Sequence, residues 1–227
     1  MNNVEQFKTT HNEEIDEKFH QLNLASIGHV AYWSKFLDKI SEVDGDIVEC
    51  GIGRGRSLII ISSLNSLLKS NRTIYAYDSF EGFPEPTEED NSFRNPKKGE
   101  WSKSPSGKYE YSKEFMESVL TEAGVKPDEN LINLKKGFFS DSLKEHPEKP
   151  IALLHVDGDL YQSYMDVLTN LYNRVAKGGI IVFDDFLFEK NGEDKFPGAR
   201  LAVEEFLGDK VKDLKVSIRG TAYLIKD

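Results

Sequence analysis

Residues 46–57 read DIVECGIGRGRS, a short β-type run that leads through glycines 51, 53 and 55 into a stretch with helical spacing. Apolar residues recur at helical intervals over 56–69, which predicts a helix directly after the turn. Glycines in such a turn let a ligand approach the backbone, and the N-terminus of a helix offers free N–H groups to an anion. The stretch therefore predicts a strand-turn-helix element that can bind a small ligand.

Similar β-rich runs alternate with helical stretches along the rest of the chain. The runs cover 46–51, 73–78, 131–137, 151–157 and 179–185, and the helical stretches cover 56–69, 112–123 and 160–175. This alternation is typical of βαβ units and a parallel sheet. After a predicted helix at 198–207, the runs 211–218 and 221–227 are joined by Arg219-Gly220, which predicts an antiparallel hairpin at the sheet edge. We therefore expect an α/β protein with a mostly parallel seven-stranded sheet, helices on both faces and an antiparallel edge strand.

The chain divides into an N-terminal helical cap at 1–44 and a larger domain at 45–227. In the cap, apolar residues share a face before and after an expected break near Gly28; they are Ile15, Phe19 and Leu22, then Val30, Trp33, Leu37 and Ile40. One irregular stretch within the larger domain, 83–110, is rich in proline and glycine, and together with the next residue it carries Trp101, Tyr109 and Tyr111. A loop of this length in a compact domain is usually functional or disordered, and we interpret it as a lid.

Composition narrows the class of protein. The 227 residues carry a net charge of −10 without a conspicuous basic cluster, which argues against nucleic acid or an anionic membrane as partner. The charge also argues against an anionic acceptor such as a nucleotide sugar or acyl-CoA. With a single cysteine, a polar N-terminus and no apolar run near the roughly 20 residues of a membrane helix, a cytoplasmic protein is expected.

The glycine-rich turn and the next strand end suggest the type of ligand. The glycine spacing departs from the G-x-G-x-x-G of dinucleotide folds, and Glu49 before the first glycine would repel a pyrophosphate. Glu49 suits a ligand with an ammonium group, such as the amino-acid end of S-adenosylmethionine. Asp78, at the end of the next strand, can accept hydrogen bonds from ribose hydroxyls. Alternatively, the turn holds no ligand and Asp78 caps a helix or forms an Asx-turn.

Three aspartates follow two further strands. Asp157 ends the run 151–157, and Asp184 and Asp185 end the run 179–185. Carboxyl ends of neighbouring strands line the ligand crevice of an open α/β sheet, where three carboxylates would repel one another without a cation. A site made of oxygen atoms alone favours a hard ion such as Mg²⁺ over Zn²⁺. The alternative is that these residues cap helices and loops.

Other acidic and histidine side chains have simpler interpretations. Asp159 is expected to cap the helix that starts near Leu160. His155 is expected to be a packed core residue and His146 to be solvated. For His29, near the expected break, the alternative is a position that faces the cleft.

These motifs resemble the macrocin and mycinamicin sugar O-methyltransferases, a branch of the class I methyltransferases with a Rossmann-like fold. The resemblance runs from about Gly45 to Leu207 and rests on GDIVECGIGRGRS, YAYDSFEGFPEP, KKGFFSDSL, HVDGDLYQSYMDVLTNLYNRVAKGGIIVFDDF and PGARLAVEEF. In that family two metal-binding aspartates lie 27 residues apart with a third adjacent, as Asp157, Asp184 and Asp185 do here. The resemblance implies that Gly51, Gly55 and Ser57 hold the methionine end of S-adenosylmethionine, that Asp78 holds its ribose, and that the adenine lies against the loop 137–141.

The combined interpretation is an S-adenosylmethionine- and Mg²⁺-dependent O-methyltransferase acting on a hydroxyl of a sugar or another small natural product. Asp157 is the expected catalytic base as well as a metal ligand. The expected cofactor-binding residues are Glu49, Gly51, Gly53, Gly55, Ser57, Asp78, Ser79, Phe80, Gly137, Phe139, Ser140, Asp141 and Asp157. The exposed apolar face of the cap predicts a homo-oligomer. Three alternatives stay open: a phenol or catechol O-methyltransferase, although the lysine base of catechol-type relatives is absent from 158–160; a non-catalytic S-adenosylmethionine-binding protein; and a nicotinamide oxidoreductase.

Overall fold

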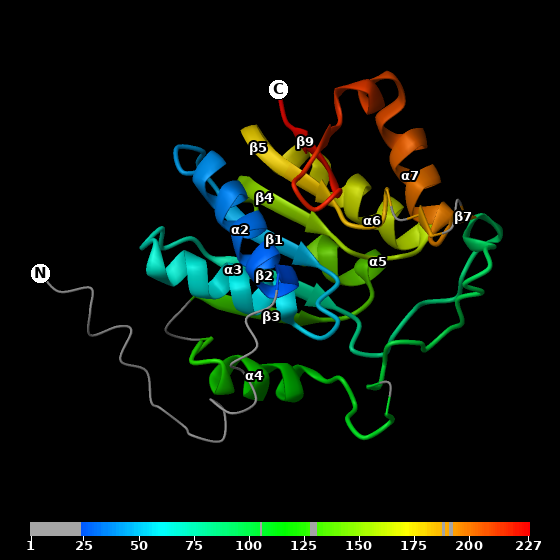
Figure 1. The fold of residues 1–227 in the computed structure, drawn as a ribbon, viewed down its shortest axis with the longest axis horizontal. Helices are drawn as coiled ribbons and strands as arrows, with labels where there is room; N and C mark the ends of the chain where they lie inside the picture. Colours follow the sequence, from blue (N-terminus) through cyan, green and yellow to red (C-terminus); the bar gives the residue numbers. More distant parts are fainter. Residues whose placement is uncertain (1–23, 105, 128–130, 188, 191–192) are drawn as a thin grey trace, which may run out of the picture.

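A seven-stranded sheet forms the centre of the molecule (Figure 1). The computed structural model describes residues 24–227 except 105, 128–130, 188 and 191–192. The strand order is β3-β2-β1-β4-β5-β9-β8, in which β1 to β5 are parallel and β9 is antiparallel to β5 and β8. The strands are β1 (Asp46–Cys50), β2 (Ile74–Asp78), β3 (Ile132–Lys136), β4 (Ile151–Val156), β5 (Val175–Phe183), β8 (Lys215–Val216) and β9 (Ala222–Ile225). The predicted Rossmann-like class I fold and its antiparallel edge are confirmed.

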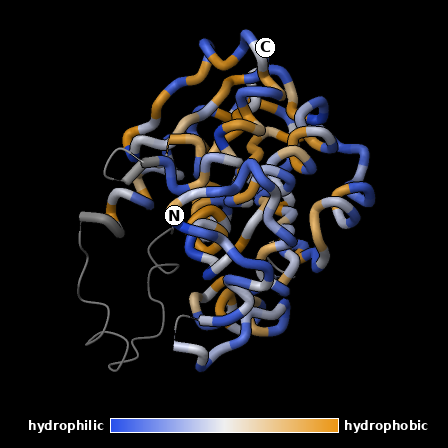
Figure 2. Tube along the Cα trace, turned by 90° about the vertical axis from the view of Figure 1, so that its right-hand side faces the viewer, coloured by the Kyte–Doolittle hydropathy of each residue, from blue (hydrophilic) through white to orange (hydrophobic). Residues whose placement is uncertain are grey.

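Helices cover both faces of this sheet because each strand alternates with a helix that carries an apolar side. On one face, α2 (Leu24–Lys39), α3 (Arg56–Leu67) and α4 (Lys113–Glu122) bury side chains such as Trp33, Leu58 and Met116 in one core cluster. On the other, α5 (Phe139–Ser142), α6 (Tyr161–Leu171) and α7 (Pro197–Leu207) pack a second cluster around Tyr164 and Ala202. Hydrophobic and hydrophilic segments alternate along the tube in Figure 2, as expected for buried strands joined by exposed turns.

The helix α2 corrects one prediction about the N-terminal segment. Helix continues from Leu24 to Lys39 through Gly28, so the break expected near Gly28 is wrong. A glycine inside a helix costs only about 1 kcal/mol, and Tyr32, Trp33 and Phe36 anchor this helix in the core. The earlier apolar face, with Ile15, Phe19 and Leu22, lies outside the described residues. The division at 44/45 stays a prediction, although α2 shares its core cluster with β1 and α3.

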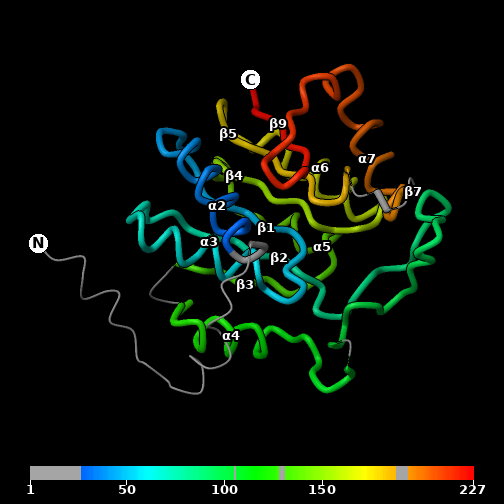
Figure 3. Tube along the Cα trace, in the orientation of Figure 1, coloured from blue at the N-terminus to red at the C-terminus, as the bar shows by residue number. Residues whose placement is uncertain are grey.

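The proline-rich stretch at 83–110 is a hydrogen-bonded loop that contains the short 3-10 helix η2 (Glu88–Asp90). Its first residue pairs with residues 99 and 100, since the Phe83 N–H donates to the Glu100 carbonyl at 2.8 Å and the Gly99 N–H donates to the Phe83 carbonyl at 2.9 Å. In Figure 3 the loop runs from β2 to α4 along one side of the molecule and passes β7 (Glu193–Asp194) and the start of α7. The loop is therefore docked onto the second helix layer.

One histidine, His146, lies in an unexpected environment. His146, expected to be solvated, is buried, because its ring packs against Tyr75 and Tyr77 of β2 and its Nδ1 lies 2.8 Å from the Tyr77 hydroxyl. That expectation was wrong, because this burial depends on contacts with β2 that the local sequence does not reveal.

Within the described residues, every helix is too short or too polar to cross a membrane.

Candidate active site

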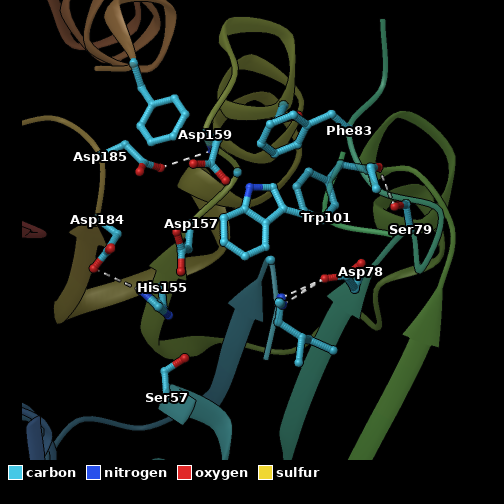
Figure 4. A pocket seen from close by; sticks show the side chains of 18 of the residues that line it. Ser57, Asp78, Ser79, Phe83, Trp101, His155, Asp157, Asp159, Asp184 and Asp185 are labelled. Carbon is cyan, nitrogen blue, oxygen red and sulfur yellow. Dashed lines mark hydrogen bonds and ion pairs between the residues drawn. The ribbon is translucent and has the colours of Figure 1, made fainter. Parts of the chain in front are cut away.

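A cavity of about 640 Å³ opens at the carboxyl ends of the central strands. Its wall includes the glycine-rich turn after β1, Asp78 at the end of β2, Asp157 after β4, and Asp184 and Asp185 after β5. Figure 4 shows Asp157, Asp184 and Asp185 on one side of the cavity and Asp78 on the other. The topology thus brings together three motifs that lie up to about 130 residues apart in the sequence.

The three glycines of the turn have different physical roles. Gly51 has φ +96°, and a Cβ there would lie 1.8 Å from the backbone oxygen of Asp157, so the chain can pass beside β4 only without a side chain. Gly55 has φ +77° and a Cβ would lie 2.6 Å from Met116 Sδ. Gly53 has φ +52° with no heavy atom near a built Cβ, so its backbone faces open space in the cavity. A ligand can therefore approach the turn closely at Gly53.

Asp78, the last residue of β2, forms hydrogen bonds with this turn. Its Oδ2 accepts hydrogen bonds from the N–H groups of Ile52 at 2.9 Å and Gly53 at 3.2 Å. Its Oδ1 accepts from the N–H of Phe80 at 2.7 Å, which is the Asx-turn that the sequence offered as an alternative. An ionised carboxylate has about four lone-pair sites, so these three bonds leave acceptor capacity for a ribose hydroxyl.

Glu49 lies behind the cavity wall instead of on it. Its side chain is fully buried, and its Oε1 accepts hydrogen bonds from the Ser57 hydroxyl and from Nδ1 of His155 at 3.2 Å. The other ring nitrogen of His155 lies 3.8 Å from Asp184 Oδ1. Burial by itself lowers the pKa of His155, but the contacts with Asp184 and Glu49 outweigh it and raise that pKa to about 10. A buried cationic imidazole thus links the glycine-rich turn with the acidic cluster.

Asp157, Asp184 and Asp185 form the acidic cluster that the sequence predicted. Each offers a carboxylate oxygen, and these oxygens lie within 4.8 Å of one another. Burial and the charge of Asp184 raise the pKa of both Asp157 and Asp185, whereas the ion pair with His155 overcomes burial and lowers the pKa of Asp184. Carboxylates that raise one another's pKa in this way are stabilised by a cation, and an oxygen-only set suits Mg²⁺.

Asp159 is a cavity residue whose role the sequence misidentified. Its backbone has φ +59°, an uncommon conformation outside glycine, and its N–H donates to Asp185 Oδ2 at 3.0 Å. It caps no helix: α6 starts at Tyr161, whose N–H donates to Asp90 Oδ1 of the loop at 2.8 Å. Burial and the neighbouring charge of Asp185 raise the pKa of the Asp159 carboxyl. A fourth acid therefore lies beside the cluster of three, which only long-range packing could reveal.

Aromatic side chains supply much of the remaining wall. In the view of Figure 4 the indole of Trp101 stands between the acidic cluster and Asp78, with Phe83 beside it. Trp101 has φ +67°, and its ring lies 5.3 Å from the Arg54 guanidinium carbon. The aromatic cavity residues of the 83–111 segment and of other loops are Phe83, Trp101, Tyr111, Phe138, Phe139 and Phe196. Of the three aromatic residues noted in the predicted lid, Tyr109 alone is absent from the wall.

The predicted cofactor residues divide into two groups. Those that line the cavity are Gly51, Gly53, Ser57, Asp78, Ser79, Phe139, Ser140 and Asp157. Those that do not are Glu49, Gly55, Phe80, Gly137 and Asp141. Phe80 is turned into the core, and Asp141 is an exposed residue 3.5 Å from Lys144 Nζ. Gly137 donates its N–H to the Asp78 carbonyl and so supports the site from behind.

Basic side chains also line the cavity, and the sequence suggested such a position only for His29 among them. They are His29 of α2, Arg54 and Arg56 of the glycine-rich turn, Lys195 before α7, and Arg219 of the turn between β8 and β9. His29 thus takes the cleft-facing position that was its alternative. Their separation in the chain explains why no basic cluster is visible in the sequence.

Comparisons with known proteins agree with this architecture. Residues 34–212 match the family model described as macrocin-O-methyltransferase (TylF). The chain is 30% identical over 171 residues to mycinamicin III 3''-O-methyltransferase of Micromonospora griseorubida, covering 72% of this chain and 61% of that protein. It is also 30% identical to demethyldecarbamoylnovobiocin O-methyltransferase of Streptomyces niveus, covering 73% of this chain and 59% of that one. The matches thus span about three fifths of these relatives. The structure of the O-methyltransferase NovP superposes with a TM-score of 0.71 at 26% identity, covering 87% of this chain and 78% of that one.

Proposed function

Because this chain belongs to the macrocin-O-methyltransferase (TylF) family, we propose that it transfers a methyl group from S-adenosylmethionine to a hydroxyl of a sugar or another small natural product. The observation that carries the proposal is the placement of the acidic cluster in the same cavity as the glycine-rich turn and Asp78. Methyl transfer from a sulfonium is an in-line displacement, so donor and acceptor must be aligned in one site.

The cofactor is proposed to lie between the glycine-rich turn and the loop after β3. Gly53 leaves room for the methionine portion, Asp78 retains acceptor capacity for the ribose, and Phe139 and Ser140 line the adenine side. Glu49 Oε2 is buried without a hydrogen-bond partner in the described part of the chain, so an ammonium group near Ser57 would supply the missing hydrogen bond.

Asp157, Asp184 and Asp185 are proposed to hold one Mg²⁺. Their oxygen-only donor set and the raised pKa values of Asp157 and Asp185 fit a hard divalent cation. When bound, such an ion lowers the pKa of a nearby hydroxyl and helps to orient it. His155 holds Asp184 from behind, and Tyr164, whose hydroxyl lies 3.0 Å from Asp185 Oδ2, restrains Asp185.

Asp157 is the proposed proton acceptor, and Asp159 is a second candidate. As a metal ligand, Asp157 would keep limited basicity. Asp159 lines the cavity outside the metal cluster, and its raised pKa makes it a stronger base than an ordinary carboxylate. The strained backbone at Asp159 is the specific observation in its favour. Aromatic residues of the loop, with Trp101 foremost, exclude water from the acceptor side.

The relatives named above act on mycinamicin III and on demethyldecarbamoylnovobiocin, and their names support a natural-product acceptor for this chain. The aromatic wall also suits a phenol or catechol acceptor. Calorimetry with S-adenosylhomocysteine and with NAD tests the cofactor: tight NAD binding without a response to S-adenosylhomocysteine would refute the methyltransferase. Mass-spectrometric detection of a 14-Da gain, in a panel of glycosylated and catechol compounds incubated with S-adenosylmethionine, then separates the acceptor classes and tests whether the chain turns over at all.

We also propose a homo-oligomer in the cytoplasm. Ile27 and Val30 of α2 are exposed, at 51% and 45%, and offer apolar side chains to a partner subunit. Light scattering at micromolar concentration that gives a mass near 25.8 kDa would contradict the oligomer.

A further inference from the structure

Basic side chains from three distant segments meet at one side of the cavity. His29 belongs to α2, Arg56 begins α3, and Arg219 lies in the turn between β8 and β9. Arg56 Nη1 lies 3.4 Å from His29 Nε2, and Arg219 lies over the ring of Tyr32, 5.1 Å from its centroid. Burial and then the charges of Arg219 and Arg56 lower the pKa of His29, which indicates that both guanidinium groups act on the same imidazole.

This group of residues lies next to the acidic cluster. The charge of Arg219 acts on Asp184, where it helps to lower the pKa of that carboxyl after burial and His155. Asp184 in turn acts on His29 and on Tyr32. An acceptor whose hydroxyl reaches the cluster would therefore have another of its groups beside the two arginines.

Neither arginine makes an ion-pair contact within the part of the chain that the structure describes. Arg56 and Arg219 form no ion pair with a described carboxylate, although the protein carries a net charge of −10. By contrast, Arg94, Arg174 and Arg200 each form an ion pair with a carboxylate. Two guanidinium groups without a described ion pair at a cavity wall, one of them at the N-terminus of a 12-residue helix, suit an anion.

We propose that His29, Arg56 and Arg219 form a binding site for an anionic group, a phosphate or carboxylate, carried by the methyl acceptor. The proposal rests on the proposed methyl transfer and narrows its acceptor to negatively charged compounds, against the expectation from net charge. Arg56 and Arg219 bind the anionic oxygens by charge-assisted hydrogen bonds, and the neutral imidazole of His29 orients Arg56. The carboxylate of the cofactor's own methionine is the competing anion, and the experiment must distinguish the two.

Sulfate serves as the probe because it mimics both groups and binds Mg²⁺ weakly. The full chain, loaded with Mg²⁺ and S-adenosylhomocysteine, is titrated with sodium sulfate and, at matched ionic strength, with sodium chloride, and arginine Nε–Hε signals are followed by NMR. We expect saturable sulfate binding that weakens about tenfold or more in Arg56→Gln and Arg219→Gln. Lys35→Gln, which removes an exposed charge of α2 outside the cavity, should bind sulfate as the unmodified chain does.

Affinities for S-adenosylhomocysteine and for methylthioadenosine, which lacks the amino-acid group, identify the source of the anion. We expect both to stay within about threefold in the arginine variants. A loss of S-adenosylhomocysteine affinity with unchanged methylthioadenosine affinity would overturn the proposal and assign the arginines to the cofactor. Sulfate binding that is absent, or equal in all variants, would overturn it as well. If S-adenosylhomocysteine fails to bind the unmodified chain, the proposed methyltransferase function fails; the sulfate titration of the unloaded protein still tests the anion site.

Discussion

Asp90 Oδ1 accepts a hydrogen bond from the Tyr161 N–H at 2.8 Å, so the long loop supplies the cap of helix α6. The other oxygen, Oδ2, accepts from the Thr87 N–H at 2.8 Å, and a Cβ at Gly198 of α7 would lie 2.0 Å from Oδ1. Asp90 is buried at 3% exposure between the two helices. The beginning of the loop is thus part of the packed fold, while Trp101 in its later part reaches the cavity.

Replacing Asp90 is expected to destabilise the whole domain. Asp90→Ala leaves the Tyr161 N–H without its partner and should lower the free energy of unfolding by about 1–3 kcal/mol. Urea denaturation measures this change, and Glu88→Ala, in the same short helix but exposed, is the matched control. Equal stability of the two variants would contradict the capping role.

Removal of one carboxylate from the acidic cluster is expected to stop turnover without loss of the cofactor. Asp184→Asn and Asp185→Asn should abolish methyl transfer and Mn²⁺ binding, because too few charged oxygens remain to hold the ion. Affinity for S-adenosylhomocysteine should change by less than a few-fold, as measured by calorimetry. Asp38→Asn, an exposed change on α2, controls for lost charge. Full activity in EDTA would disprove the metal requirement.

The stability of the metal-free protein is expected to fall as the pH rises. Burial, followed by the charge of Asp184, raises the pKa of Asp185 to about 7, above the roughly 3.9 of an unfolded chain. A carboxyl with a raised pKa stabilises the fold below its unfolded pKa, and that contribution is lost as the pH increases through about 7. Thermal melts between pH 5 and 8 should therefore show a declining Tm in EDTA.

Magnesium should reverse this decline, and more strongly at pH 8 than at pH 5, because the ion binds the ionised carboxylates. In Asp185→Asn the pH dependence of the metal-free Tm should be shallower. A Tm that is independent of Mg²⁺ at both pH values would argue against the cluster as a cation site.

Asp78 is expected to contribute to cofactor binding in two ways. Asp78→Ala removes the proposed ribose acceptor and also releases the N–H groups of Ile52 and Gly53, so affinity for S-adenosylhomocysteine should fall by about 1–3 kcal/mol. Asp141→Asn should leave this affinity unchanged, since the exposed Asp141 lies outside the cavity. If calorimetry finds an equal loss of affinity in the two variants, the loop that carries Asp141 would have to contact the cofactor, contrary to the structure.

The fold and the acidic cluster could be predicted from the amino-acid pattern alone. Alternating strands and helices with short connections allow few topologies, and in a parallel sheet the residues after β4 and β5 must meet at one edge. For this reason Asp157, Asp184 and Asp185 could be predicted to converge. Their positions at the ends of two adjacent strands were sufficient for this prediction, because the parallel sheet places those strand ends side by side.

The side chains that complete the cavity could be identified only from the packing of distant segments. Glu49 follows the alternation of its strand into the interior, where it meets Ser57 and His155, instead of facing the ligand. The N-cap of α6 comes from Asp90, 71 residues earlier, which freed Asp159 for the cavity. The basic group of His29, Arg56 and Arg219 is assembled from three segments that no local pattern connects. Such contacts depend on how helices and loops pack across the sheet, which is a long-range property, and neither residue spacing nor net charge encodes it directly.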